Sequence, residues 1–303
     1  MSAIGLGGNT FGRFCDEAQT AAVINRALDL GVNLIDTAES YGGGVSEEFV
    51  GKAIRGRRQE VLLATKTGAL GEPAPRLTRR RIIERLDASL RRLGTDYVDL
   101  YYLHFPDPLT PLEESLRALE EVVASGKVVY PALSNYPAWQ VAEALRLGER
   151  GSWAPPVLLQ SEYSLLNRGV EAELLPALRH YGLGLIPYSP LAGGFLTGKY
   201  RRGEPAPAGT RGHGSEGFER RWLTEANFDR LDGWHEFAAG QGRSSAGLAL
   251  SWLLAEPVVC SVIVGATRPE QVEANVRAAE WRLSPEERAA VDAAAAQSPA
   301  TLR

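Results

Sequence analysis

The sequence has only two cysteines among its 303 residues, Cys15 and Cys260, which lie far apart and without histidines at metal-ligand spacing. This excludes a disulfide scaffold and a zinc site, so no metal is expected. No uninterrupted apolar run approaches the roughly 18 residues that a membrane span requires. Met1–Thr10 also lacks the charged and apolar segments of a secretory signal. We therefore expect a cytoplasmic protein without a membrane partner.

An excess of positive charge is absent as well. The 33 Lys and Arg residues are outnumbered by 37 Asp and Glu residues, which gives a formal net charge of −4, and no basic stripe runs along the chain. A nucleic-acid partner is therefore not expected. The 44% of hydrophobic residues is enough for a large globular core.

Short β-like runs alternate with amphipathic helices along the whole chain, which is typical of a parallel sheet with crossover helices. The expected strands are Ala3–Gly7, Asn33–Ile35, Val61–Thr65, Tyr97–Leu103, Val128–Leu133, Val157–Gln160, Gly184–Pro187 and Val258–Val264. The expected helices are Glu17–Leu30, Ser46–Arg55, Arg79–Leu93, a helix capped by Thr110 with Pro111 at its first position and running to Ala124, Trp139–Arg146, Glu171–Tyr181, Thr224–Gly240, Ser245–Ala255, Pro269–Ala279 and Ser284–Ala296.

Eight βα units without a break in composition predict an α/β protein with one domain over residues 1–303, a (β/α)8 TIM barrel. The chain interrupts the alternation once, between Leu191 and Arg221, and we interpret this long segment after the seventh strand as a functional loop or lid. A doubly wound open sheet is the weaker alternative, because no glycine-rich dinucleotide fingerprint follows the first strand.

Polar residues follow nearly every predicted strand. The stretch Asn33–Gly44 is the clearest case, since its apolar run stops at Asp36 and its Tyr41 precedes three glycines. The other strand ends carry Lys66, His104, Ser134, Asn135, Gln160, Tyr188, Ser189, Gly265, Thr267 and Arg268. Each alone has a structural explanation, such as a turn cap or a solvated strand end. Together they should meet at the catalytic edge of a barrel, where clustered polar groups are costly unless they pair.

Six short motifs carry a resemblance to a known family. They are Asp-Thr-Ala-x-x-Tyr-Gly at 36–42, Ala-Thr-Lys at 64–66, Leu-His-x-Pro-Asp at 103–107, Ser-Asn at 134–135, Tyr-Ser-Pro-Leu at 188–191 and Val-Gly-Ala-x-Arg-Pro-Glu-Gln at 264–271. In this order they resemble the aldo-keto reductases, in particular the branch with potassium-channel β-subunits and bacterial NADPH-dependent reductases. The resemblance implies reduction of an aldehyde or ketone by NADPH.

Four residues match the catalytic group of that family: Asp36, Tyr41, Lys66 and His104. Hydride transfer leaves charge on the carbonyl oxygen, so a proton donor must stand beside it. Tyr41 is the expected acid, and a nearby Lys66 ammonium should lower its pKa. Asp36 would hold Lys66 charged, and His104 would orient the carbonyl.

The resemblance also assigns residues to the cofactor. Tyr188 would stack on the nicotinamide, while Ser134, Asn135 and Gln160 would bind its carboxamide. The expected pyrophosphate site combines Ser189, the Leu191 backbone and the loop from Gly193 to Lys199, with Gly265 and Thr267 nearby. Arg268 would bind the 2′-phosphate of NADP, and its alternative is a solvated charge at a helix start. Gln271 and Asn275 would reach the adenine.

The sequence departs from the family pattern in three places. Relatives usually begin with a hairpin that plugs the barrel, whereas Met1 stands almost at the first strand, so either the plug is missing or the true start lies upstream. Ala274 replaces a glutamate expected to contact adenine. Pro131, followed by Ala132, removes one ladder hydrogen bond and can introduce a bulge before Ser134.

Substrate choice should lie in the loops. Candidates for an apolar pocket are Phe11, Phe14, Phe105, Tyr136 and Trp222. The long loop also carries five arginines: Arg201, Arg202, Arg211, Arg220 and Arg221. We expect them to attract the cofactor phosphates, with an anionic substrate as the alternative.

Three functions remain open at this point. The first is an NADPH-dependent carbonyl reductase acting on a small molecule, in which a homo-oligomer is possible. The second is a cofactor-sensing partner subunit with little turnover. The third is a Schiff-base aldolase with Lys66 as nucleophile.

Overall fold

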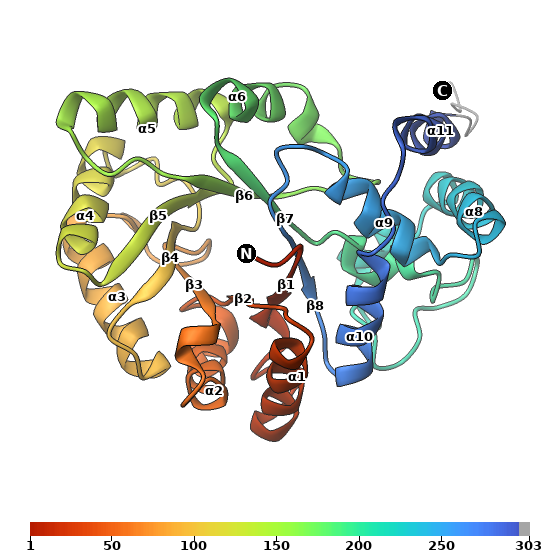
Figure 1. The fold of residues 1–303 in the computed structure, drawn as a ribbon, viewed down its shortest axis with the longest axis horizontal. Coiled ribbons are helices and arrows are strands. Elements are labelled where there is room, and N and C mark those ends of the chain that lie inside the picture. The colour runs from red at the N-terminus through yellow and green to blue at the C-terminus, as the bar shows by residue number, and fades with distance from the viewer. Residues whose placement is uncertain (297–303) are drawn as a thin grey trace.

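The computed structural model describes residues 1–296 and contains one sheet of eight parallel strands surrounded by helices (Figure 1). The strands are β1 (Ile4–Gly7), β2 (Leu34–Asp36), β3 (Leu62–Thr67), β4 (Val98–Leu103), β5 (Val128–Ser134), β6 (Leu158–Glu162), β7 (Gly184–Tyr188) and β8 (Val262–Gly265). Their order in the sheet is β7-β6-β5-β4-β3-β2-β1-β8, so the first strand pairs with both the second and the last. The eight strands and their alternation with helices confirm the predicted (β/α)8 barrel.

The helices lie outside the strands. They are α1 (Glu17–Asp29), α2 (Val45–Ala53), α3 (Arg79–Leu93), α4 (Leu112–Ala124), α5 (Ala138–Gly151), α6 (Leu174–Tyr181), α7 (Glu216–Trp222), α8 (Glu225–Gly240), α9 (Ser245–Leu254), α10 (Pro269–Ala278) and α11 (Pro285–Ala296). Helix α3 ends at Gly94, whose left-handed backbone (φ 63°) lets its amide donate to the Leu90 carbonyl as a C-terminal cap.

The barrel closes between β7 and the segment that precedes β8. The Leu185 amide donates to the Val258 carbonyl at 2.7 Å, and the Cys260 amide donates to the Leu185 carbonyl at 2.9 Å. The predicted last strand, Val258–Val264, therefore combines this short bridge with β8 itself. Without these bonds, β7 and β8 would be the free edges of an open sheet.

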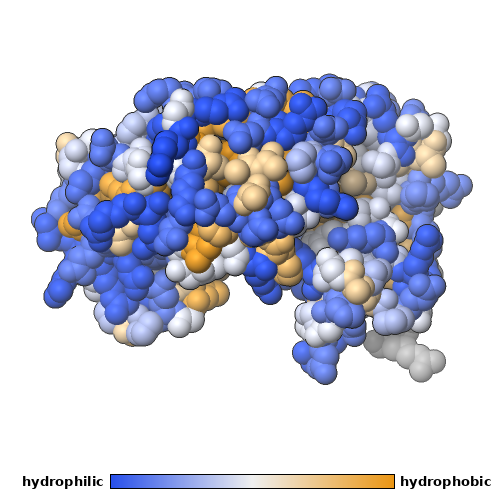
Figure 2. Space-filling view, turned by 90° about the horizontal axis from the view of Figure 1, so that it is seen from below, coloured by the Kyte–Doolittle hydropathy of each residue, from blue (hydrophilic) through white to orange (hydrophobic). Residues whose placement is uncertain are grey.

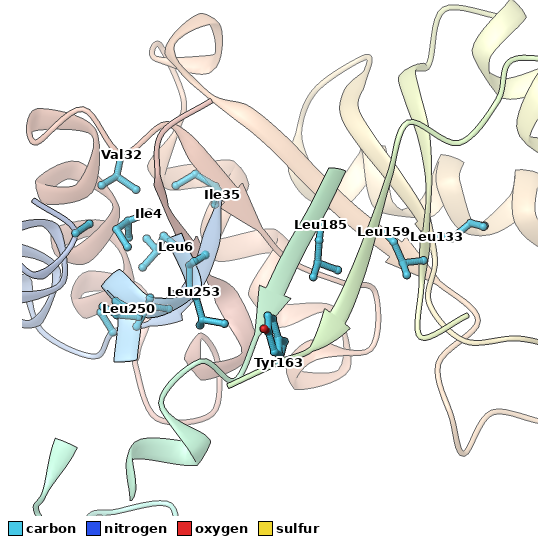
Figure 3. Close-up of a cluster of buried hydrophobic side chains, with 14 of the residues drawn as sticks. Ile4, Leu6, Val32, Ile35, Leu133, Leu159, Tyr163, Leu185, Leu250 and Leu253 are labelled. Atoms are coloured by element: carbon cyan, nitrogen blue, oxygen red, sulfur yellow. The ribbon is translucent and has the colours of Figure 1, made fainter. Parts of the chain in front are cut away.

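Both faces of the sheet are apolar, as expected for parallel strands that are covered on both sides. The barrel interior is filled by Leu34, Ala64, Leu100, Tyr102, Ala132, Leu158, Ile186 and Ile263. The outer face packs against the helices, and Figure 3 shows Ile4, Leu6 and Leu185 of the strands in this layer, together with Leu250 and Leu253 of α9. The polar residues of the strands are thus concentrated at the strand ends.

Two predicted helix starts were wrong. Helix α4 begins at Leu112 with Pro111 in the cap position, and Thr110 donates its hydroxyl hydrogen to Asp107 at 2.7 Å instead of capping the helix. The predicted helix Glu171–Tyr181 is split into a 3-10 turn (Gly169–Glu171) and α6. In the long segment after β7, the chain forms a 3-10 helix, η5 (Ala192–Thr197), and α7.

Pro131 does not introduce a bulge. The register between β4 and β5 runs without an extra residue through Tyr101↔Pro131 and Tyr102↔Ala132. The ladder between β5 and β6 starts only at Leu133↔Leu159, and the Pro131 carbonyl already accepts from the Val157 amide at 3.1 Å. The proline nitrogen therefore lies where the ladder to β6 has not begun, so its missing N–H disturbs no pairing.

The face of the molecule seen in Figure 2 is mainly hydrophilic, with hydrophobic residues in separate groups. Among the helices of residues 1–296, none is both long enough and apolar enough to cross a membrane.

Candidate active site

A cavity of about 670 Å³ opens at the carboxyl ends of the strands. Most of the site residues predicted from the sequence line it: Asp36, Tyr41, His104, Asn135, Gln160, Tyr188, Ser189, Leu191, Gly193, Lys199, Gly265, Thr267, Gln271 and Asn275. Three predicted residues, Lys66, Ser134 and Arg268, are not among the lining residues. The fold therefore brings together residues that are up to 239 positions apart in the sequence, from Asp36 at the end of β2 to Asn275 on α10.

Lys66 lies just beneath the cavity wall and is fully buried. Its ammonium group pairs with the Asp36 carboxylate, donates to the Thr37 carbonyl at 2.8 Å and lies 3.5 Å from the Tyr41 hydroxyl. An ammonium has three N–H donors, and each of them has one of these partners. Lysine, carboxylate and phenol thus form the connected group that the sequence predicted.

The second oxygen of Asp36 is also occupied, because Gln160 donates its side-chain amide to it at 2.9 Å. Asp36 is buried, with 2% of its surface exposed, so this bond and the Lys66 pair are what make a charged carboxylate tolerable there. Gln160 therefore supports the acidic residue in addition to lining the cavity.

Tyr41 is held by the turn between β2 and α2. It opens a 3-10 helix, η2 (Tyr41–Gly44), in which Gly42 and Gly43 have φ values of 59° and 67°. A side chain at either position would strain this left-handed backbone. The two glycines therefore explain how the chain can turn away immediately after presenting the phenol.

Glu39 fastens the same turn to the strand that carries Lys66. One of its carboxylate oxygens accepts the Thr67 hydroxyl at 2.8 Å and the Gly68 amide at 3.1 Å. Thr67 is the residue after Lys66, so these bonds fix the distance between the Tyr41 turn and the end of β3. The sequence analysis did not single out Glu39.

The pKa of Lys66 is raised. Burial favours the neutral amine, but the Asp36 carboxylate and the Tyr41 hydroxyl more than offset this effect. The lysine is therefore an ammonium at neutral pH.

The pKa of Tyr41 did not follow the prediction. Burial raises the pKa of the phenol above its ordinary value, and the Asp36 charge adds to this, whereas Lys66 and Arg211 act in the opposite direction. The cost of removing a phenolate from water exceeds the stabilisation by the ammonium. Tyr41 is therefore a neutral phenol at neutral pH.

His104 is neutral as well. Burial and the nearby Lys66 charge lower its pKa to about 3. Its ring stacks on Phe105, with centroids 4.9 Å apart, and meets the Tyr41 ring edge-on at 6.1 Å. Among the described residues the buried Nδ1 atom has no hydrogen-bond partner. A neutral imidazole keeps one N–H to donate, so His104 can offer a hydrogen bond without a charge.

A second chain of hydrogen bonds joins the strand ends on the other side of the cavity. The Tyr188 hydroxyl donates to the Asn135 side chain at 2.8 Å, and Asn135 donates to the His104 carbonyl and the Ser134 hydroxyl, both at 3.0 Å. Asn135 and Ser189 have positive φ values of 62° and 52°. Such backbone is uncommon outside glycine and is concentrated at functional sites. Ser134 acts here through Asn135 and not as part of the cavity wall.

Two cations, Lys199 and Arg211, also line the cavity, and Arg211 lies near enough to Tyr41 to act on its pKa. No carboxylate of residues 1–296 lies within ion-pair distance of either, and burial followed by mutual repulsion lowers the pKa of Lys199. Arg202 and Arg221, by contrast, pair with Glu225 and Glu162 away from this wall. Arg211 is therefore the only one of the five loop arginines that lines the cavity.

Arg268 is exposed and forms the N-cap residue of α10 without a side-chain capping bond. Next to it, Gln271 accepts hydrogen bonds from the Thr267 amide at 2.7 Å and from the Thr267 hydroxyl at 3.2 Å. The start of α10 is thus ordered by Gln271, while the Arg268 side chain is exposed to solvent.

Three of the five aromatic residues expected in a substrate pocket were misassigned. Phe11, Tyr136 and Trp222 are buried in the core outside the barrel, while Phe14 and Phe105 line the cavity. Gly194 and Thr197, in the predicted pyrophosphate loop, also line the cavity. Several other lining residues were not predicted individually: Gly7, Thr10, Pro190, Gly209, Thr210, Ile263, Val264 and Ala266. They come from irregular loops or from apolar strand ends, where no periodic signal distinguishes them. Among the described residues no cluster of three or more His, Cys, Asp or Glu side chains forms a metal site.

Fold and cavity together define a (β/α)8-barrel protein with its ligand site at the carboxyl ends of the strands. The chain belongs to the aldo/keto reductase family, whose sequence model, "Aldo/keto reductase family", matches residues 3–296. This family assignment supports an oxidoreductase.

Three relatives show the range of similar proteins. A "Probable voltage-gated potassium channel subunit beta" of Oryza sativa subsp. japonica is 39% identical over 89% of this chain and 84% of its own length. The "L-glyceraldehyde 3-phosphate reductase" of Escherichia coli (strain K12) is 38% identical over 92% and 84%. The human "Aldo-keto reductase family 7 member A3" is 36% identical over 95% and 91%. Both enzymes and channel subunits are therefore similar to this chain.

Proposed function

We propose that the protein reduces an aldehyde or ketone to the alcohol, with NADPH as the hydride donor and Tyr41 as the general acid. The observation that carries the proposal is the buried group formed by Asp36, Lys66 and Tyr41 at the cavity wall. A stable barrel does not need an ammonium ion in its interior, since burying one is costly. A proton donor beside a reacting carbonyl does need a cation at this place.

Within this proposal, each residue of the group has one task. Tyr41 gives its proton to the carbonyl oxygen, and the Lys66 ammonium 3.5 Å away stabilises the phenolate that this leaves. Asp36 keeps Lys66 charged, and Gln160 keeps Asp36 in place. Neutral His104 donates a hydrogen bond to the same oxygen and adds no competing positive charge.

The residues around the cavity fit a nicotinamide dinucleotide. Tyr188 offers an aromatic face. The Gln160 amide and the remaining acceptor capacity of the Asn135 side-chain oxygen offer hydrogen bonds to a carboxamide. Lys199 and Arg211, which lack carboxylate partners within residues 1–296, suit phosphate groups, together with the backbone around Gly193. When bound, NADPH supplies the hydride.

The test is turnover by the purified protein. NADPH oxidation is followed by nicotinamide absorbance with a panel of aldehydes and ketones, and NADPH binding is followed by protein fluorescence. The proposal expects saturable oxidation with at least one carbonyl compound. Tight NADPH binding without turnover of any carbonyl would contradict it.

Preference for NADPH over NADH is assigned to Arg268. Replacing it with alanine should raise the Kd for NADPH about tenfold and leave the Kd for NADH within about twofold, because only NADPH carries the 2′-phosphate. Arg277→Ala, on the same helix and paired with Glu273, is the control and should change neither. Equal effects of Arg268→Ala on both cofactors would show that this arginine does not bind the 2′-phosphate.

A partner subunit that senses its cofactor is the second candidate, and the rice relative named as a channel subunit supports it. It predicts NADPH binding with very slow turnover, so the same panel separates the two functions. A Schiff-base aldolase is disfavoured, because Lys66 would have to be neutral to attack a carbonyl and its pKa is raised.

We also propose that the protein acts in the cytoplasm, since both of its cysteines are free and Cys260 is exposed. Fractionation of the source cells tests this. A homo-oligomer remains a hypothesis that light scattering would decide.

A further inference from the structure

Tyr102 lies in the barrel interior beside Lys66. In the parallel pairing of β3 with β4, Tyr102 is the register partner of Lys66. Register partners on neighbouring strands point to the same side of the sheet, and here that side is the barrel interior. Both side chains are fully buried. The site described above assigns no role to Tyr102.

The ammonium of Lys66 is flanked by two aromatic rings. Its nitrogen lies 5.0 Å from the centre of the Tyr41 ring and 5.6 Å from the centre of the Tyr102 ring. Both distances are within the range of cation–π attraction, which is strongest where water is excluded. The three N–H groups already have partners in Asp36, Thr37 and Tyr41. Aromatic rings therefore replace part of the water that an exposed ammonium would have around it.

The hydroxyl group of Tyr102 does not explain why a tyrosine occupies this position. It is buried beside the Gln160 side chain, and no hydrogen bond of ordinary geometry reaches it among the described residues. Burial raises the pKa of this phenol well above its ordinary value, so it carries no charge and gives up no proton. A phenylalanine would fill the space next to Leu100 and Ile186 equally well and without an unpaired hydroxyl. The ring face beside Lys66 is the part of Tyr102 that contacts the site.

We propose that Tyr102 is a positioning residue for the reduction, whose ring face keeps the Lys66 ammonium charged and directed at the Tyr41 hydroxyl. The proposal rests on the proposed function only in that Lys66 assists Tyr41. The other titratable groups around Lys66 are Asp36 and Tyr41, from β2 and the turn after it, and His104, which follows β4. All three stay unchanged in the variants that test the proposal.

Three variants separate the ring from the hydroxyl and from simple packing. Tyr102→Phe removes only the hydroxyl and is the matched control. Tyr102→Leu and Tyr102→Met both remove the ring. Methionine has about the volume of leucine but is longer and more flexible, so it can adapt to the space if the leucine variant does not fold. The sequence contains four lysines: Lys52, Lys66, Lys127 and Lys199. Lysine side chains labelled with ¹³C and ¹⁵N therefore give few NMR signals, and the signal that is missing from the Lys66→Arg variant is that of Lys66.

The first measurement is the titration of the Lys66 signal up to about pH 11.5. Both ring-less variants should titrate about one pH unit below wild type, the shift expected for the loss of one buried cation–π contact. Tyr102→Phe should titrate like wild type. Identical curves for wild type and a folded ring-less variant would overturn the proposal. This measurement needs no turnover, so it remains decisive even if the reductase proposal fails.

The second measurement is the pH profile of kcat with NADPH and an accepted aldehyde. The alkaline limb is the pH range in which kcat falls as the pH rises. It should lie about one pH unit lower in the ring-less variants than in wild type and stay in place in Tyr102→Phe, and KM should change less than about twofold. A role limited to packing would lower the melting temperature and leave the limb where it is. An unmoved limb in a folded ring-less variant would therefore contradict the proposal, while absence of turnover in wild type would contradict the reductase function alone.

Discussion

At the scale of single residues, the site consists of groups whose charge state is set by burial. Lys66 stays charged because Asp36 and Tyr41 offset its desolvation, whereas His104, with a Lys66 charge nearby and no carboxylate partner, becomes neutral. The two basic side chains lie close together but respond in opposite directions to their surroundings. In the proposed reaction, this difference would let the Lys66 ammonium act on the Tyr41 hydroxyl while uncharged His104 donates a hydrogen bond to the carbonyl oxygen.

The low pKa of His104 has a consequence for stability. In the unfolded chain, a histidine takes up a proton below about pH 6.5, whereas the folded protein resists protonation until about pH 3. The unfolded state then binds one more proton, so stability falls by roughly 1.4 kcal/mol per pH unit as the pH drops from about 6.5 towards 3. This loss is absent above pH 6.5.

His104→Gln should remove this part of the pH dependence. Urea unfolding of wild type and variant at pH 7 and pH 5 measures it, and the shared titrations of carboxylates cancel in the comparison. Wild type should lose about 2 kcal/mol more than the variant between the two pH values. Equal losses would mean that His104 is already protonated in the folded protein or is exposed to water.

At the scale of elements, the loops after β3 and β4 are joined by one carboxylate. Asp107 accepts hydrogen bonds from the Leu77 amide at 3.0 Å, the Thr110 hydroxyl at 2.7 Å and the Leu109 amide at 3.2 Å, and from the Arg76 amide. Although burial acts in the other direction, these bonds hold the pKa of Asp107 below its ordinary value. Asp107 therefore fixes the loop that follows His104.

Asp107→Ala should destabilise the protein by about 3 kcal/mol, because it leaves several partly buried donors without an acceptor. Asp107→Asn keeps one acceptor oxygen and should cost about half as much. The free energy of unfolding in urea is the measurement, and Asp96→Ala, at an exposed position before β4 that makes none of these hydrogen bonds, is the surface control. An Asp107→Ala variant as stable as wild type would show that water satisfies these donors.

The elements also show what sequence can and cannot predict. Asp36, Lys66 and His104 could be predicted because strand ends of a parallel barrel share one edge, so their order in the chain implied their meeting in space. Arg211 could only be predicted as one of five loop arginines, since an irregular loop has no periodicity that shows which side chain turns inward. Phe11 and Tyr136 were misplaced because aromatic residues shortly after a strand end can turn under the helices as well as into the cavity, and Trp222 was misplaced because it ends a short helix, α7, within the long segment after β7.

Strand register is a second feature that the sequence does not show. The position of Pro131 is tolerated because the ladder to β6 begins after it, and the role proposed for Tyr102 depends on its register with Lys66. Register between strands far apart in the sequence is decided by packing in the whole barrel. The raised pKa of Tyr41 likewise depends on burial, which a list of neighbouring residue types does not contain.

At the scale of the whole molecule, closure of the barrel between β7 and the segment before β8 brings two groups of residues to one cavity. Asp36, Tyr41, Lys66 and His104 lie on or after strands β2, β3 and β4. Lys199, Arg211 and the start of α10, which are proposed to bind phosphates, lie in the chain after β7. The proposed cofactor would therefore contact residues from both halves of the chain. Binding it should stabilise the barrel as a unit, because a ligand that binds only the folded state shifts the folding equilibrium.

The most direct test of the account is Tyr41→Phe, which removes one hydroxyl group and leaves the ring. Because the phenol is proposed to give the proton and not to bind the cofactor, kcat for the best carbonyl substrate should fall at least a hundredfold, while the Kd for NADPH should change less than about twofold. Turnover at the wild-type rate, or loss of NADPH binding in a folded variant, would contradict the role assigned to Tyr41.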